Sequence, residues 1–449
     1  MSQSFMKEKP VLPLVLSMSL PMVFSMLVNA LYNIVDSFYV ARISEEALTA
    51  VSLIFPLQNL VSALAIGFGI GINVVISISL GAGKKEKADQ AFTKGVVLSE
   101  LHGLICTVLC LICMSPFISC FTDQSLIHAY AMEYGMVVFA FSVFFHLAMA
   151  FEKIFQAVGR MKTSMVALLA GCVFNIILDP IAIFGFGPIP AMGIGGAAFA
   201  TGLGQTLQLV VYLAVLKRTQ IGLHFSLNGW KSERRSVREM YATGIPATLN
   251  LALPSVLITC LNSILSSLSS TGVLILGIYY KLQTFLYLTT NGFVQGMRPI
   301  IGYNYGAGEK ERVRSIFMTV LGLSGIVMVI GTLICQCIPE TLIGIYSSSH
   351  VTIQDGSNAL KIISTGFIIS TVSCTVTGAL EGLGKGMPSL LISFLRNIGI
   401  MVPCAFLLSC MIGVNGVWMS FPVTECICAV VSVYCCSRYI QENEFWDDS

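Results

Sequence analysis

Twelve long apolar runs dominate this sequence, and they restrict the folds open to the chain more than any other feature. A helix needs about 20 apolar residues to cross the hydrocarbon core of a bilayer, and each run reaches that length. Charged residues make up 11% of the 449 residues, whereas soluble domains carry about 25%. We therefore predict an all-α polytopic membrane protein with twelve transmembrane helices. The expected spans are roughly residues 12–40, 47–80, 92–121, 127–150, 163–184, 193–216, 239–268, 272–305, 313–338, 359–380, 388–411 and 413–437.

The two halves of the chain repeat each other with a constant offset, which carries Gly67 to Gly292. Residues 67–71 read Gly-Phe-Gly-Ile-Gly and residues 292–296 read Gly-Phe-Val-Gln-Gly, and each segment runs on to a Gly-Ala-Gly sequence. Pro21 and Pro246 show the same offset. Six spans per half is an even number, so both halves enter the membrane in the same direction and form a parallel repeat. We expect two pseudo-symmetric six-helix lobes.

Basic residues indicate the orientation of these spans, because Lys and Arg concentrate on the cytoplasmic side of membrane proteins. Twenty of the 25 Lys and Arg residues fall in segments on one side of the membrane, and one, Arg42, falls on the other. Both termini are therefore expected in the cytoplasm. The expected division is an N-terminal lobe at residues 1–216, a cytoplasmic connector at 217–238 and a C-terminal lobe at 239–449.

Several classes of function are disfavoured by the composition and the motifs. The net charge of +2 implies no nucleic-acid partner. Residues 81–85 (Gly-Ala-Gly-Lys-Lys) lack the spacing and the Ser/Thr of a Walker A motif, so ATP hydrolysis is not expected. The five histidines include no pair with metal-ligand spacing, and no Asp-rich cluster suits the magnesium diphosphate of a polyprenyl transferase. We expect no enzyme activity, no cofactor and no resident metal other than a coupling ion.

Polar side chains within three spans form the candidate coupling site. Ionisable groups at the bilayer centre cost about 2.5–3.5 kcal/mol on insertion scales. The presence of Asp36 within the first span therefore indicates a functional role. Asn175 and Asp179 are four residues apart and share one face of the fifth span, and Thr201 lies in the sixth. Two carboxylates, an amide and a hydroxyl suit a hard cation such as Na+ or a shared proton. The alternative for Asp179 is a solvated position near the outer helix end.

The candidate coupling site occurs once in the chain. The offset between the halves carries Asp36 to Leu261 and Asp179 to Cys404, and neither of these second-half residues is acidic. Ion coupling is therefore expected in the first lobe alone.

Polar and aromatic residues within the spans are candidates to line a substrate cavity. Lys281 and Gln283 lie in the eighth span, and Tyr32 and Asn33 lie in the first. Aromatic faces attract flat cations through cation–π contact. These four residues are the candidates. For an aromatic residue such as Tyr32 the alternative is packing, and for Lys281 it is an ion pair with Glu425.

Three further charges of the second half are expected to be structural. Glu425 has two possible partners, Arg396 and Lys281. Arg298 lies near the cytoplasmic end of its span, where a long side chain can extend to the interface.

Small residues and prolines within the spans are candidates for hinges or close packing. Glycine permits close contact between helices, either in a static bundle or between lobes that rock. The residues in this group are Pro21, Gly67, Gly71, Gly292 and Gly296.

Taken together, these motifs resemble the multidrug and toxic compound extrusion (MATE) family, and the resemblance covers nearly the whole chain. It is carried by Pro21 with Asp36, the glycine-rich segments 67–71 and 81–83, the Asn175/Asp179 pair, residues 196–201 (Gly-Ala-Ala-Phe-Ala-Thr) and the second Gly-Ala-Gly at 306–308.

The resemblance implies a secondary antiporter of the cell (inner) membrane that exports cationic and amphipathic compounds in exchange for Na+ or H+. It implies that two lobes form a V around a central cavity and that alternating access moves the substrate. Our own expectation is that the protein functions as a monomer. It also assigns the cation site to Asp36, Asn175, Asp179 and Thr201. Some members carry acids in the seventh and tenth spans, where this chain has Pro254 and Ser370. The chain is therefore similar to the bacterial drug-exporter branch.

A flippase for lipid-linked saccharides, which shares the superfamily architecture, is the alternative. It would need a basic cavity lined by Lys281, Arg298 and Arg396. The acidic first lobe argues against it.

Overall fold

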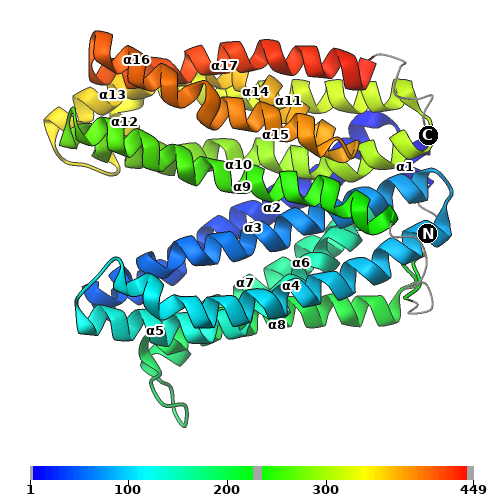
Figure 1. The fold of residues 1–449 in the computed structure, drawn as a ribbon, viewed down its shortest axis with the longest axis horizontal. Coiled ribbons are helices and arrows are strands. Elements are labelled where there is room, and N and C mark those ends of the chain that lie inside the picture. The colour runs from blue at the N-terminus through cyan, green and yellow to red at the C-terminus, as the bar shows by residue number, and fades with distance from the viewer. Residues whose placement is uncertain (1–3, 226–234, 442–449) are drawn as a thin grey trace. The chain divides into compact units, whose positions relative to one another are not determined.

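The computed structural model describes residues 4–225 and 235–441, and helices account for nearly all of their regular structure (Figure 1). The first half of the chain forms α1 (Phe5–Glu8), α2 (Val11–Ala41), α3 (Glu45–Gly81), α4 (Lys85–Ser119), α5 (Ser125–Ala140), α6 (Ser142–Ala157), α7 (Met161–Phe184) and α8 (Gly193–Arg218). The second half forms α9 (Arg235–Ser266), α10 (Ser270–Gly306), α11 (Lys310–Cys337), α12 (Pro339–Gly344), α13 (His350–Ser364), α14 (Phe367–Gly382), α15 (Gly386–Phe394), α16 (Met401–Ile412) and α17 (Val414–Cys436), with the π-helical turns η2 (Leu395–Gly399) and η3 (Ser437–Gln441). Within the described residues, extended pairing is limited to one isolated bridge between Phe186 and Ile189. The all-α prediction is confirmed.

The helices follow the twelve predicted spans in order. Nine helices in the described part of the chain are long and apolar enough to cross a membrane, and two bent pairs raise the number to eleven. Helix α10 has 37 residues and occupies the range predicted for the eighth span, although it is not among those eleven.

The internal repeat extends to the places where helices bend. The fourth span is α5 and α6, which meet at Phe141 with a bend of 46°. The tenth span is α13 and α14, which meet at Thr365 and Gly366 with a bend of 53°. The offset that relates Gly67 to Gly292 also relates Phe141 to Gly366, so the repeat in the sequence is also a repeat of backbone geometry.

The Gly-Ala-Gly sequences are helix ends that require glycine. Gly83 has a φ of +70° just beyond the end of α3, and Gly308 has a φ of +74° just beyond the end of α10. Residues with a Cβ rarely adopt this left-handed conformation. The repeated motif therefore ends two equivalent spans and turns the chain into the next helix.

Contacts divide the described chain into two compact units. Among the described residues, the first unit holds residues 4, 24–225 and 235–248, and the second holds residues 5–23 and 249–441. Helices α2 and α9 each contribute to both units. The lobe boundaries expected at 216/217 and 238/239 stay a prediction, and residues 226–234 of the expected connector lie outside the described residues.

Each unit has an apolar core of its own. In the first unit, the rings of Phe155 and Tyr212 stack at 5.3 Å between centroids, and both are fully buried. In the second unit, Trp418 is 1% exposed and packs within a cluster that includes Leu261 and Tyr279. Lipid chains are as apolar as these residues, so close packing rather than escape from water holds such helices together.

The glycines singled out in the sequence lie at close helix contacts. A Cβ at Gly67 of α3 would lie 2.6 Å from the Thr248 backbone nitrogen of α9, within the first unit. A Cβ at Gly292 of α10 would lie 2.8 Å from the Val23 Cα of α2, within the second. Val23 and Thr248 are themselves equivalent positions of the repeat. The same contact therefore occurs once in each unit.

The second glycine of each pair repeats this arrangement one turn further along. A Cβ at Gly71 would clash with the carbonyl group of Met240, and one at Gly296 would lie 2.7 Å from the Cα of Ser19. Pro21 lies within the same part of α2 as Ser19 and is buried.

Candidate functional site

Helix α7 brings the fifth-span pair together. Asn175 and Asp179 are one turn apart, and the Asn175 side-chain amide donates to Asp179 Oδ1 at 3.2 Å. Asn175 is 2% exposed and Asp179 is 0% exposed. The alternative of a solvated Asp179 is therefore wrong in this structure, because its carboxylate is enclosed by protein.

Helices α8 and α2 complete the polar contacts around this pair. Thr201 of α8 lies with its Oγ1 3.5 Å from the Asn175 amide nitrogen and 3.4 Å from the Tyr32 hydroxyl of α2. Both distances are long for hydrogen bonds. Three helices of the first unit therefore meet around Thr201, and Tyr32 lies at the candidate coupling site.

Asp36 follows Tyr32 by one turn of α2, so the two side chains share a face. The Asp36 carboxylate is within electrostatic reach of Asp179. Its Oδ1 atom is buried and has no hydrogen-bond partner in the part of the chain that the structure describes. The structure thus brings Asp36, Asn175, Asp179 and Thr201 into one polar site.

Three buried oxygen atoms of this site have no hydrogen-bond partner among the described residues. Among the described residues, none donates to Asp36 Oδ1, Asn175 Oδ1 or Asp179 Oδ2. Buried oxygens without partners cost free energy, and native proteins usually satisfy them. Carboxylate, amide and hydroxyl oxygens are the ligands of hard cations. The arrangement is suited to bind a small cation or a proton, with only two acidic groups to balance its charge.

Two residues near the site were absent from the sequence prediction. Tyr134 of α5 is 3% exposed and lies within electrostatic reach of Asp36 and Asp179. Its hydroxyl accepts a hydrogen bond from the Gln58 side chain of α3 at 3.4 Å. Gln58 could have been found in the sequence, because it is an amide within an apolar span. Tyr134 could not, because a single tyrosine within a span is not unusual.

The four candidates for a substrate cavity have different surroundings. The Tyr32 hydroxyl contacts Thr201 of the candidate coupling site, whereas the Asn33 amide donates to the backbone carbonyl of Asn29 at 2.8 Å. In the second unit, Lys281 is exposed and lies 5.6 Å from the centre of the Tyr346 ring. Gln283 is half-buried. A common cavity for these residues stays a prediction.

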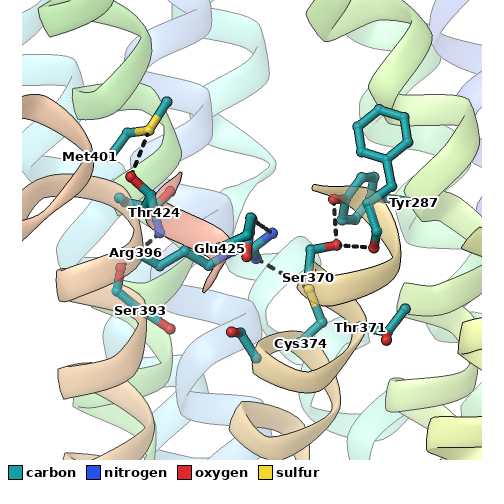
Figure 2. Close-up of polar contacts among 12 residues, drawn as sticks. Tyr287, Ser370, Thr371, Cys374, Ser393, Arg396, Met401, Thr424 and Glu425 are labelled. Atoms are coloured by element: carbon teal, nitrogen blue, oxygen red, sulfur yellow. Dashed lines mark hydrogen bonds and ion pairs between the residues drawn. The ribbon is translucent and has the colours of Figure 1, made fainter. Parts of the chain in front are cut away.

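Glu425 pairs with Arg396, which is one of the two partners expected. The Arg396 Nη2 atom lies 2.6 Å from Glu425 Oε1, and Figure 2 shows the pair between helices of the second unit. Lys281 lies against Tyr346 instead.

The Arg298 side chain does not extend to the interface, as the sequence had led us to expect, but pairs with an acidic residue. Its Nη2 atom lies 2.7 Å from Glu381 Oε2, and its side chain is 19% exposed. The Asn250 amide donates to Glu381 Oε1 at 2.9 Å and to Ser389 Oγ at 3.1 Å. The guanidinium group is held within the second unit because a buried carboxylate lies close to it.

The first unit has an equivalent buried ion pair with different residues. Lys153 Nζ lies 2.7 Å from Glu152 Oε1, and the Gln156 amide donates to the same oxygen at 2.8 Å. The offset between the halves places Gln156 opposite Glu381. An ion pair therefore lies near equivalent positions in the two units, but the charged residues that form it are not themselves at equivalent positions.

Comparison with known proteins shows the family. The MatE family model matches residues 21–181 and again residues 246–407, and the two matches begin at the equivalent prolines Pro21 and Pro246. The multidrug export protein MepA of Staphylococcus aureus (strain bovine RF122 / ET3-1) is 24% identical over 436 residues, which cover 96% of this chain and 94% of that protein. MepA of Staphylococcus haemolyticus (strain JCSC1435) is 23% identical over 439 residues, with the same coverage.

Solved structures share the fold. A crystal structure of MATE in complex with MaD3S has a TM-score of 0.92 at 21% identity and covers 100% of this chain and 99% of that chain. The outward-facing conformation of a multidrug resistance MATE family transporter of the MOP superfamily has a TM-score of 0.92 at 22% identity and covers 98% of this chain and 99% of that chain. Since the family model covers most of both halves and the fold is shared along the whole chain, this protein belongs to the MatE family of multi-pass membrane proteins.

Proposed function

We propose that this protein is a secondary active antiporter that exports cationic and amphipathic compounds in exchange for Na+ or H+. The observation that carries the proposal is the set of unpartnered buried oxygens on Asp36, Asn175 and Asp179, for which the described residues supply no donor. The relatives named multidrug export protein, which align over 96% of this chain, support the substrate class.

Export is coupled to ion entry because the cation and the exported compound favour different states of the transporter. When an inward-moving cation fills the site of the first unit, it neutralises the carboxylates of Asp36 and Asp179. A ligand shifts a conformational equilibrium only if it binds the two states differently. The cation therefore favours the state that releases the exported compound, and its departure to the cytoplasm resets the carboxylates.

The remaining features of the proposal follow from the sequence. The protein acts in the cell (inner) membrane with both termini in the cytoplasm, as the distribution of Lys and Arg indicates. The ion gradient across the membrane supplies the free energy for export, so ATP is not consumed. The working unit is the monomer.

The flippase alternative receives less support from the charges. Its basic cavity would need free cationic groups, but Arg298 is paired with Glu381 and Arg396 with Glu425. Ion pairs therefore neutralise two of the three basic residues that such a cavity would need, and Lys281 is the third.

Transport from proteoliposomes tests the proposal. We expect ethidium efflux to be driven by an imposed Na+ gradient or by an imposed H+ gradient, and the effective gradient identifies the coupling ion. Wild-type protein that moves ethidium under neither gradient, but transfers a fluorescent lipid-linked saccharide between leaflets, would favour the flippase.

A further inference from the structure

A second polar cluster lies within the second unit, apart from the residues that the proposed coupling uses. Figure 2 shows Arg396 in η2, Glu425 on α17, Cys374 on α14 and Tyr287 on α10. Arg396 lies ten residues into the span Gly386–Ile412, and Glu425 lies eleven residues into the next span. Charges at such depth are expensive and usually functional.

One carboxylate oxygen of Glu425 takes no part in the hydrogen bonds of this cluster. Arg396 Nε donates to Glu425 Oε1 at 2.8 Å, and Nη2 approaches the same atom at 2.6 Å. A two-pronged arginine contact normally uses both carboxylate oxygens. Here Glu425 Oε2 is buried and has no hydrogen-bond partner among the residues that the structure describes. This oxygen can accept a hydrogen bond from a second cation.

Arg396 has other favourable contacts besides Glu425. Its Nη1 donates to Cys374 Sγ at 3.1 Å, and its guanidinium carbon lies 6.0 Å from the centre of the Tyr287 ring. A guanidinium group over an aromatic face is stabilised by cation–π attraction. Arg396 therefore keeps part of its stabilisation if Glu425 turns to another cation.

The surroundings suit an organic cation better than a metal ion. Tyr287 and Ser370 bind each other at 2.7 Å, so their hydroxyls are already occupied. Phe421 precedes Glu425 by one turn of α17, and its ring contacts Tyr279 with 5.2 Å between centroids. A hard cation requires several oxygen ligands, whereas aromatic rings and sulfur favour a delocalised, weakly hydrated cation.

The backbone at Arg396 is also unusual. Residues Leu395–Gly399 form a π-helical turn, in which the Ile400 N–H donates to the Leu395 carbonyl at 2.9 Å. Such turns are rare and often occur at functional sites. The offset between the halves places Gly171 of the first unit opposite Arg396. The second half has therefore added a charged side chain at a position where the first half has none.

We propose that Glu425 is a recognition residue for the cationic group of the exported compound, and that Arg396 is the internal cation which this group displaces. The inference rests on the proposed function and adds a residue of the second unit that recognises substrate. Ion coupling stays with the first unit. Arg396 pairs with Glu425 between transport cycles and competes with the exported cation for it.

Equilibrium binding of ethidium to the purified full-length protein tests this role. Glu425→Gln should weaken ethidium binding about tenfold, since a hydrogen bond to a charged group is lost. Arg396→Gln should strengthen binding, because the internal competitor is gone. The double variant Arg396→Gln/Glu425→Gln keeps two neutral, similarly shaped side chains and should bind as weakly as Glu425→Gln. Glu340→Gln, an exposed carboxylate of the same unit, is the matched control and should bind like wild type.

The opposite signs of the two single variants separate recognition from a structural role. If the pair only stabilised the fold, Arg396→Gln and Glu425→Gln would lower the unfolding temperature together, and the folded double variant would bind ethidium like wild type. That result would overturn the inference while leaving gradient-driven efflux by wild type, and with it the proposed function, intact. Wild-type protein that neither binds nor exports ethidium would overturn the proposed function instead.

Discussion

Asn175 donates its side-chain amide to Asp179 at 3.2 Å across one turn of α7. The bond fixes one oxygen of a carboxylate that is 0% exposed, while the other oxygen has no partner among the described residues. Asn175 thereby orients Asp179 and adds its own free Oδ1 atom to the site. Under the proposed function, Asn175 and Asp179 together supply two of the ligands of the cation site.

Replacing the amide should therefore weaken ion coupling. We expect Asn175→Ala to raise the ion concentration for half-maximal ethidium efflux about tenfold, because one ligand is lost and Asp179 is no longer oriented. Efflux from proteoliposomes across a series of ion gradients measures this. Asn358→Ala, which alters a surface amide of the second unit, is the control. Equal values for the two variants would contradict the role of Asn175.

The hydroxyl of Thr201 should make a smaller contribution. It lies 3.5 Å from the Asn175 amide and 3.4 Å from the Tyr32 hydroxyl, so its contacts are weak. We expect Thr201→Ala to raise the half-maximal ion concentration about fivefold, within the range for one neutral hydrogen bond. Thr201→Ser, which keeps the hydroxyl, should remain close to wild type. A defect of the same size in both variants would mean that the methyl group, and not the oxygen, is required.

Added side chains at the close helix contacts should destabilise the protein. Gly67→Val and Gly292→Val place atoms against the backbone of Thr248 and Val23, and overpacking typically costs about 1–3 kcal/mol. Gly322→Val is the matched control, since a Cβ there has no neighbour within 4 Å among the described residues. Thermal unfolding in detergent should show lowered midpoints for the first two variants alone. A similar shift for Gly322→Val would show that the crowding seen at the contacts is not the cause.

The buried pair of Arg298 and Glu381 should be sensitive to the loss of one partner. Glu381→Gln leaves the guanidinium group without its counter-charge, which costs about 3 kcal/mol for buried pairs. We expect a clear fall in the unfolding temperature. The double variant Arg298→Met/Glu381→Met should recover much of it, because no lone charge remains. If the double variant were less stable than Glu381→Gln, the pair would contribute more than mutual neutralisation.

Much of the fold could be predicted because the membrane imposes it. Spans need long apolar runs, and the offset between Gly67 and Gly292 showed that two halves share one plan. The assignment of α2 and α9 to both contact units could not be predicted. It depends on how Gly67 packs against Thr248 and Gly292 against Val23, and hydropathy carries no information on which span a glycine meets.

The candidate site was predictable where the cost of burial gave the signal. Asp36 and Asp179 are acids inside apolar spans, and the spacing of Asn175 and Asp179 placed them on one helical face. Partners that come from distant spans gave no such signal. Arg298 was expected at the interface because its partner Glu381, which lies on a different helix much later in the chain, could not be identified from sequence.

Gradient-driven ethidium efflux by Asp36→Asn tests the central claim most directly. The variant keeps the size of the side chain but removes the charge, and Asp123→Asn provides the control, since Asp123 is exposed between α4 and α5. We predict that Asp36→Asn folds and binds ethidium but shows no efflux driven by Na+ or H+, while Asp123→Asn transports like wild type. Unimpaired gradient-driven efflux by folded Asp36→Asn would show that coupling does not depend on the first-unit site.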